Sequence, residues 1–191
     1  MKKISFTLAI SILIFLTACG PSREKSVLRI KETEKRLYDR NITTFSKSGA
    51  DSLVTMYEDF ARHFPGDSLA PVYLFNAAGI AMNSNEGPKA LELFSKIIEK
   101  YPTYRKAPLC LFFKGYVEEN MMHNLDKAKE LYLLFIEKYP KHEFVSAAQA
   151  SLQNLGKSPE QMMKEFEARQ KADSTRVADS VAKLKGKKKK K

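Results

Sequence analysis

A thirteen-residue string that occurs twice constrains the fold of this chain more than any other feature. Residues 90–102 read ALELFSKIIEKYP and residues 128–140 read AKELYLLFIEKYP, with eight identical positions. A looser copy at residues 53–65 also closes on an aromatic residue and Pro, so the three aromatic-Pro pairs lie 37 and then 38 residues apart. Self-similarity at a period of roughly 34 to 40 residues is typical of stacked helix pairs, which bury their apolar faces only against their neighbours. The sequence therefore predicts an all-α repeat protein.

The size and charge of the chain agree with a single helical body. Its 191 residues, 43% of them hydrophobic, can build a real core. The formal net charge is +11, but nine of the lysines stand at positions 2 and 3 and in residues 183–191, and the rest of the chain carries +2. Because the body is close to neutral and has no basic face, we expect no nucleic-acid partner.

The first eighteen residues form a predicted signal peptide. Two lysines precede an apolar run over residues 4–16, which is too short to span a bilayer. The next residues, Leu16-Thr17-Ala18-Cys19, resemble the bacterial lipoprotein box, in which the cysteine is lipidated and becomes the mature first residue. The resemblance implies a lipid anchor on Cys19 and a tether over residues 19–22. The alternative is a secreted protein in which Cys19 is incidental.

The resemblance to lipoproteins also implies a location. Lipoproteins of this kind tend to stay on the inner membrane when Asp follows the cysteine, and here Gly20 follows it. Residues 20–24 contain no acidic run of the kind that directs lipoproteins to the cell surface in some bacterial groups. We therefore expect an outer-membrane lipoprotein that faces the periplasm.

Residues 23–172 are expected to form the repeat domain. Apolar residues at helical spacing predict a first helix over residues 23–45 and a second that Asp51 or Ser52 caps and that ends before Pro65. Pro71, Pro88 and Pro108 suit first helical turns. The turn over residues 120–124 is expected to carry one extra residue, which accounts for the spacing of 38. A partial fourth pair has a helix over residues 143–155, a stop at Gly156 and a new helix from Ser158-Pro159.

Two of these units resemble the tetratricopeptide repeat. The residues that match the small, Ala, aromatic and Pro positions of the family are Ala78, Ala90, Phe94 and Pro102 in the second unit, and Gly115, Ala128, Tyr132 and Pro140 in the third. The resemblance implies a right-handed solenoid of three to four antiparallel helix pairs that binds other proteins. In plan the chain is similar to repeat lipoproteins that take part in outer-membrane assembly.

The resemblance also implies a ligand groove on the first helix of each pair. The positions that usually face the ligand in this family fall here on Tyr38, Ile42, Phe75, Met82, Phe112 and Tyr116. Such an apolar, aromatic groove would suit an amphipathic helix or an extended hydrophobic segment. The alternative is that these side chains only pack between repeats, and the sequence leaves both open.

The C-terminal part of the chain is polar. Residues 173–184 predict a helical extension, with a thin apolar seam that either caps the repeats or mediates self-association. Residues 185–191 are expected to be a disordered tail, whose basic side chains are Lys185, Lys187, Lys188, Lys189, Lys190 and Lys191. This tail is either a solvated end or a segment that anionic lipids or wall polymers attract.

We found no constellation of residues that predicts catalysis. The three histidines lack ligand spacing, and His142-Glu143 is not a zinc-protease motif because Ser146 stands where the second His is needed. Cys110, in an apolar setting, is expected to be a buried structural thiol. We therefore expect no enzyme, no metal and no cofactor, but a lipid-anchored scaffold for an unidentified protein partner, or else an envelope tether that acts through its lysine tail.

Overall fold

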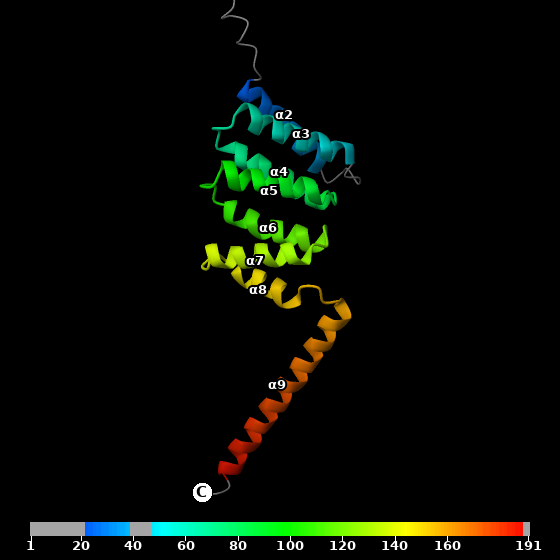
Figure 1. Cartoon of the computed structure of the whole chain (residues 1–191), viewed down its shortest axis with the longest axis vertical. Coiled ribbons are helices and arrows are strands. Elements are labelled where there is room, and N and C mark those ends of the chain that lie inside the picture. The colour runs from blue at the N-terminus through cyan, green and yellow to red at the C-terminus, as the bar shows by residue number, and fades with distance from the viewer. Residues whose placement is uncertain (1–21, 39–46, 189–191) are drawn as a thin grey trace, which may run out of the picture. The chain divides into compact units, whose positions relative to one another are not determined.

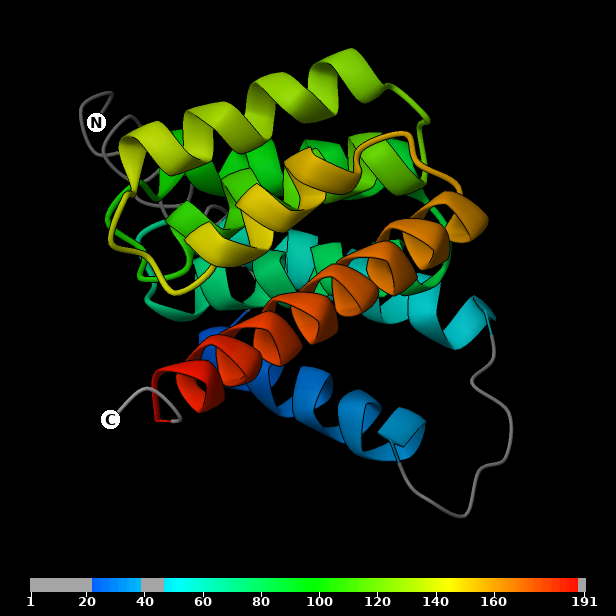
Figure 2. The same cartoon turned by 90° about the horizontal axis from the view of Figure 1, so that it is seen from below.

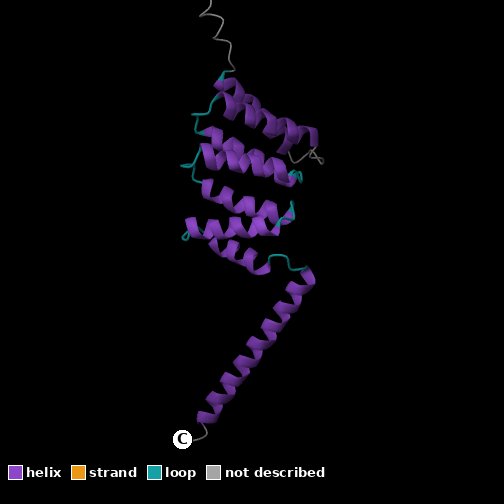
Figure 3. Cartoon of the chain, viewed as in Figure 1, coloured by secondary structure: helices purple, strands orange, loops and turns teal. Residues whose placement is uncertain are grey.

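The predicted all-α fold is confirmed. The computed structural model describes the backbone of residues 22–38 and 47–188, and the side chains of residues 22–37 and 47–177. These residues contain eight helices and no strand (Figures 1 and 3). The helices are α2 (Arg23–Tyr38), α3 (Lys47–His63), α4 (Leu69–Asn83), α5 (Gly87–Lys100), α6 (Ala107–Asn120), α7 (Leu125–Lys138), α8 (Val145–Asn154) and α9 (Pro159–Lys188).

The chain divides into two compact units, Met1–Leu131 and Tyr132–Lys191. In the first unit each helix packs against the next one along the chain, from α2 on α3 to α5 on α6. Two views show α2 at one edge of this unit (Figures 1 and 2). Packing between consecutive helices is the arrangement that a helical repeat requires.

The aromatic-Pro turns repeat in their hydrogen bonds as well as in their sequence. In each turn the carbonyl of the aromatic residue accepts the N–H of the residue three positions on, whose own carbonyl accepts an N–H three positions further. The three residues involved are Phe64, Asp67 and Ala70 in the first turn, Tyr101, Tyr104 and Ala107 in the second, and Tyr139, His142 and Val145 in the third. The same pair of backbone hydrogen bonds therefore recurs at the spacings of 37 and 38 residues that the sequence shows.

The extra residue of the 38-residue spacing lies in the turn between α6 and α7, as predicted. Asn85 and His123 occupy equivalent places in the two corresponding turns, with positive φ angles of 58° and 54°. After the first of them, the N–H of Glu86 bonds to the carbonyl five residues earlier; after the second, the N–H of Asn124 bonds to the carbonyl six residues earlier. The second turn is thus longer by one residue.

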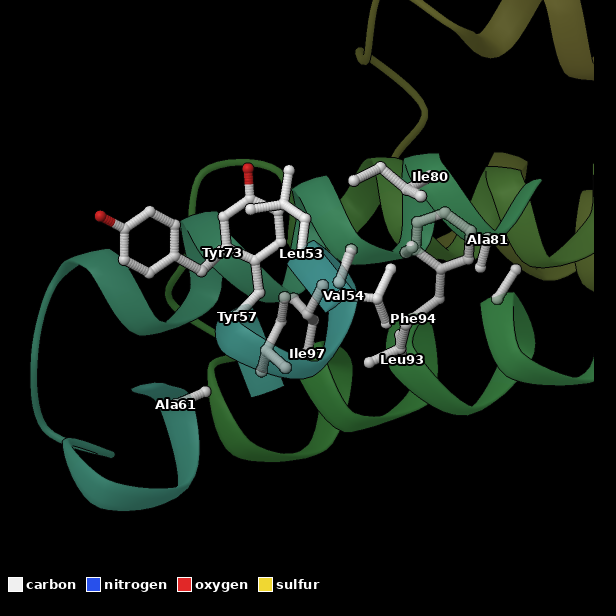
Figure 4. Packing of buried hydrophobic residues seen from close by; sticks show 14 of the residues in the cluster. Leu53, Val54, Tyr57, Ala61, Tyr73, Ile80, Ala81, Leu93, Phe94 and Ile97 are labelled. Atoms are coloured by element: carbon white, nitrogen blue, oxygen red, sulfur yellow. The ribbon is translucent and has the colours of Figure 1, made fainter. Parts of the chain in front are cut away.

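The core of the first unit lies mainly among α3, α4 and α5 (Figure 4). The Tyr57 ring stacks on the Tyr73 ring with centroids 5.1 Å apart, and Phe60 meets Tyr73 edge-on at 4.9 Å. From the repeated string, the fully buried residues are Ala90, Leu93, Phe94 and Ile97. Their burial confirms that the string supplies packing residues.

Cys110 is a buried structural thiol, as expected. It belongs to the core, and its Sγ lies 3.3 Å from the Lys106 carbonyl oxygen one helical turn earlier. Burial raises the pKa of this thiol to about 12. Since the thiolate is the reactive form, Cys110 is inert in the folded protein.

The start of the chain differs from the expected helix pair. The first helix is described from Arg23 to Tyr38, and the rest of its predicted range, residues 39–45, lies outside the described part. The next helix begins at Lys47, so Asp51 and Ser52 stand within α3 and do not cap it. Ala50 in its first turn is fully buried. Burial in the core accounts for this early start, because tertiary packing outweighs local capping preferences.

The second unit contains the latter part of α7, together with α8 and α9. Tyr132, Phe135 and Ala148 are buried, and the Phe135 and His142 rings meet edge-on with centroids 5.3 Å apart. Gly156 has a φ of 74° and follows α8, which confirms the predicted stop. The N–H of Ser158 donates to Gln161, and its hydroxyl accepts the Gln161 N–H, which makes a capping box for α9.

Helix α9 is continuous through the predicted segment boundaries. Its 30 residues run from Pro159 to Lys188, which corresponds to about 45 Å of helix. No break occurs at residue 172 or 184, and the helix includes residues 185–188 of the expected disordered tail. The side chains of residues 167–177 are all exposed. Within the described ranges, no helix has the length and apolarity needed to cross a membrane.

Candidate functional site

A hollow of about 320 Å³ lies between helices α2 and α4 of the first unit. We call it the α2–α4 pocket. Its wall combines one carboxylate, two amides and a tyrosine with apolar groups. The lining residues are Glu34 from α2, Tyr57 from α3, and Phe75, Asn76, Gly79, Ile80 and Asn83 from α4. This mixture of an apolar surface with a few polar groups is typical of binding sites.

The carboxylate of the pocket is held by a tyrosine. The Tyr57 hydroxyl donates a hydrogen bond to Glu34 Oε1 at 2.6 Å. The Glu34 carboxylate also affects a tyrosine of the core. Burial raises the pKa of Tyr73, and the negative charge of Glu34 raises it further. The short bond between residues on two helices fixes the carboxylate at the pocket wall.

Gly79 keeps the floor of the pocket open. A Cβ atom built at this residue would meet nothing within 4 Å. Asn76 and Asn83 stand seven residues apart on the same helix, two turns along one face, and both are exposed. A segment that enters the pocket would find amide donors and acceptors on either side of an apolar floor.

Phe75 joins the pocket to an aromatic cluster. Its ring centroid lies 6.1 Å from those of Phe94 and Phe113 and 6.5 Å from that of Tyr104. The Lys106 ammonium stands 4.4 Å from the centroid of the Phe75 ring, in cation–π geometry. The half-buried Phe75 is therefore fixed by its neighbours on α5 and α6 while one part of it faces the pocket.

The six residues predicted for a groove lie in different environments. Phe75 is in the α2–α4 pocket, and Tyr116 on α6 is 41% exposed. Phe112 is only 7% exposed, and Met82 packs against the core. For these two residues the structure favours the packing interpretation that the sequence left open. The Tyr38 side chain and all of Ile42 lie outside the described part.

Neither the predicted lipid anchor nor the side chains of the basic tail belong to the described part of the chain. Cys19 precedes the first described residue. The backbone of Lys185, Lys187 and Lys188 is helical, but their side chains are not described, and residues 189–191 follow the last described residue. These sites therefore remain predictions.

A second hollow, of about 500 Å³, lies between α3 and α5. Four of its five charged lining residues take part in ion pairs, and the fifth is Lys100. Glu58 lies 2.9 Å from the Lys89 ammonium and 3.9 Å from that of Lys96, and Asp59 lies 2.6 Å from the Arg62 guanidinium. Because most of its charges are already paired, this hollow is less suited to recognise a charged ligand than the α2–α4 pocket.

Sequence reasoning missed the polar wall of the pocket. The spacing of Asn76 and Asn83 could have revealed it, since residues seven apart share a helix face. Glu34 carried no such indication, because its place depends on how α2 packs against α3. Among the described residues, no three His, Cys, Asp or Glu side chains gather as a metal site.

Comparison with known proteins adds no relative. No protein-family model matches the chain, and no curated protein matches its sequence.

Proposed function

We propose that this protein is a lipid-anchored scaffold of the bacterial cell envelope that binds a segment of another protein. In this proposal the helices form tetratricopeptide-like repeats, Cys19 carries the lipid, and the repeats face the periplasm from the outer membrane. The protein would serve as an accessory of an outer-membrane assembly complex. The order of helix packing and the repeated turns support the repeat assignment.

One observation carries the binding function, namely the α2–α4 pocket with its open floor at Gly79. Its lining supplies an apolar surface through Phe75 and Ile80, and amides through Asn76 and Asn83. Apolar anchors flanked by hydrogen-bonding groups are what a helix or an extended segment of a partner requires. The exposed Tyr116 on α6 is a further aromatic residue on a first helix of a pair.

Site-specific photo-crosslinking tests this function. We would place a benzophenone amino acid at Asn76 or at Tyr116 in the full chain in cells, and at Glu99 on the exposed side of α5 as a control. We expect a discrete crosslinked partner from the first two positions and none from Glu99. A partner that crosslinks equally from Glu99 would contradict binding at the pocket.

A blocked pocket gives the matched control. Gly79→Leu places a side chain in open space on a helix, so the variant should fold and yet fill the pocket. Gly66→Leu adds the same side chain at another open position, outside the pocket. We expect the Asn76 crosslink to fall at least about tenfold in the first variant, which is the effect of losing roughly 1.4 kcal/mol of binding energy, and to persist in the second. Deletion of residues 187–191 should leave the Asn76 crosslink unchanged. Loss of the crosslink in this deletion variant would favour the tail as the binding element.

A further inference from the structure

Among the residues that the structure describes, Glu34 is the only charged one that lines the α2–α4 pocket. Within the described ranges, no Lys, Arg or His nitrogen lies within 4.0 Å of its carboxylate. Asp67 and Glu58, by contrast, pair with Arg23 and Lys89. Its one described side-chain partner is the Tyr57 hydroxyl. Within the described part of the chain, the pocket therefore presents a negative charge that Tyr57 orients and that no cation pairs with.

The rest of the lining suits a long side chain with a charged end. Phe75 and Ile80 supply apolar surface beside the carboxylate, and Gly79 leaves room between them. Lysine and arginine lay their methylene stems along apolar surface while their charged ends reach a polar partner. Asn76 and Asn83 have no side-chain hydrogen bond within the described part and can bind the backbone of the entering segment.

We infer that the α2–α4 pocket recognises a lysine or arginine side chain on the partner segment, with Glu34 as its counter-charge. This inference rests on the proposed function and names the chemistry of the bound segment. A hydrogen bond between ionised groups is about twice as strong as one between neutral groups, so the basic residue contributes affinity. An acidic residue at the same place would be repelled by the Glu34 carboxylate. This repulsion supplies specificity for basic residues.

Four degenerate peptide libraries provide the probe. Each library consists of ten-residue peptides with random flanks and one fixed central residue: Lys, Arg, Gln or Glu. Binding to the purified full chain is measured by fluorescence polarisation. We expect the Lys and Arg libraries to bind about tenfold more tightly than the Glu library, the effect of one charge-assisted contact.

Two variants of α2 separate the pocket from general electrostatics. Glu34→Gln removes the charge but keeps an oxygen that can accept from Tyr57, so the fold is maintained. Glu32→Gln removes the same charge from an exposed residue two positions earlier, which faces away from Glu34 on a helix. The preference for basic peptides should disappear in the first variant and remain in the second. Glu34→Lys should reverse it in favour of the Glu library.

Several results would overturn the inference. The first is equal binding of the four libraries, including no binding to any of them. The second is a preference for basic peptides that stays undiminished in Glu34→Gln. The third is a loss of that preference in Glu32→Gln that is as large as the loss in Glu34→Gln. If the preference is absent while the Asn76 crosslink still depends on Gly79, the inference fails and the proposed function stands. If neither depends on the pocket, both fail.

Discussion

At the scale of single residues, Asp67 links three helices. Its carboxylate accepts hydrogen bonds from the guanidinium of Arg23 at the start of α2, and Oδ1 also accepts the backbone N–H of Leu69 at 2.9 Å, in the first residue of α4. The turn that contains Asp67 follows α3. The hydrogen bond from Arg23, and after it that from Leu69, holds the pKa of the Asp67 carboxyl below its ordinary value.

This depressed pKa predicts a pH-dependent contribution to stability. Because the folded state favours the charged carboxylate, the contribution is fully present above the ordinary pKa of about 3.9 and is lost as the pH falls through the lower pKa of the folded state. Asp67→Asn should therefore lower the urea midpoint of unfolding at pH 7, and the difference from the parent should shrink towards zero in acid. Urea titrations at pH 7 and near pH 3 measure both quantities.

Asp51→Asn is the matched control, because Asp51 is exposed and its described side chain has no ion pair. Its midpoint should stay near that of the parent at both pH values. A deficit in Asp67→Asn that is as large in acid as at neutral pH would show that the charge plays no part.

At the scale of helices, the close approach of α5 to the end of α6 depends on one glycine. Gly87 is the first residue of α5 and is buried. A Cβ atom at this residue would stand 2.9 Å from Met122 Sδ and 3.3 Å from Met121 Cβ. The sulfur can move, since it ends a flexible side chain, but the Met121 Cβ is fixed to the backbone. The contact thus limits which residue can begin α5.

Gly87→Leu should consequently destabilise the fold by overpacking. We expect a loss of about 1 to 3 kcal/mol in the free energy of unfolding. Gly66→Leu, where a Cβ meets nothing within 4 Å, should change it by no more than about 0.5 kcal/mol. Chemical denaturation of the two variants beside the parent measures the difference, and equal midpoints for the two would rule out the steric explanation.

At the scale of the whole molecule, the sequence predicted the repeated elements, the stop at Gly156 and the start of α9, and it missed contacts that no local pattern encodes. The helices that carry the repeated string, their turns and the extra residue near His123 follow from local patterns of Pro, aromatic and small residues. The bond from Tyr57 to Glu34 joins residues 23 positions apart on two helices, and no periodicity encodes such a contact. The repeat was therefore predictable and the pocket was not.

The proposed attachment of the whole molecule to a membrane gives a further prediction. Cys19→Ser lacks the sulfur that the diacylglycerol group needs, and more than one acyl chain is required for stable anchoring. Metabolic labelling with a clickable fatty acid should show complete loss of label in this variant, and the chain should leave the envelope fraction. Cys110→Ala should keep both label and location, because that thiol is buried in the core. Label that persists in Cys19→Ser would refute the lipid anchor.

The unequal turns have a consequence for changes in chain length. The aromatic-Pro turns keep the same pattern of three-residue hydrogen bonds in all three places, so an inserted residue there would break the pattern. The turn between α6 and α7 already accommodates one residue more than the turn between α4 and α5, and its residues Met122, His123 and Asn124 are exposed. An epitope or a spectroscopic label is best inserted in the turn after α6, where the chain itself shows that added length leaves the helices intact.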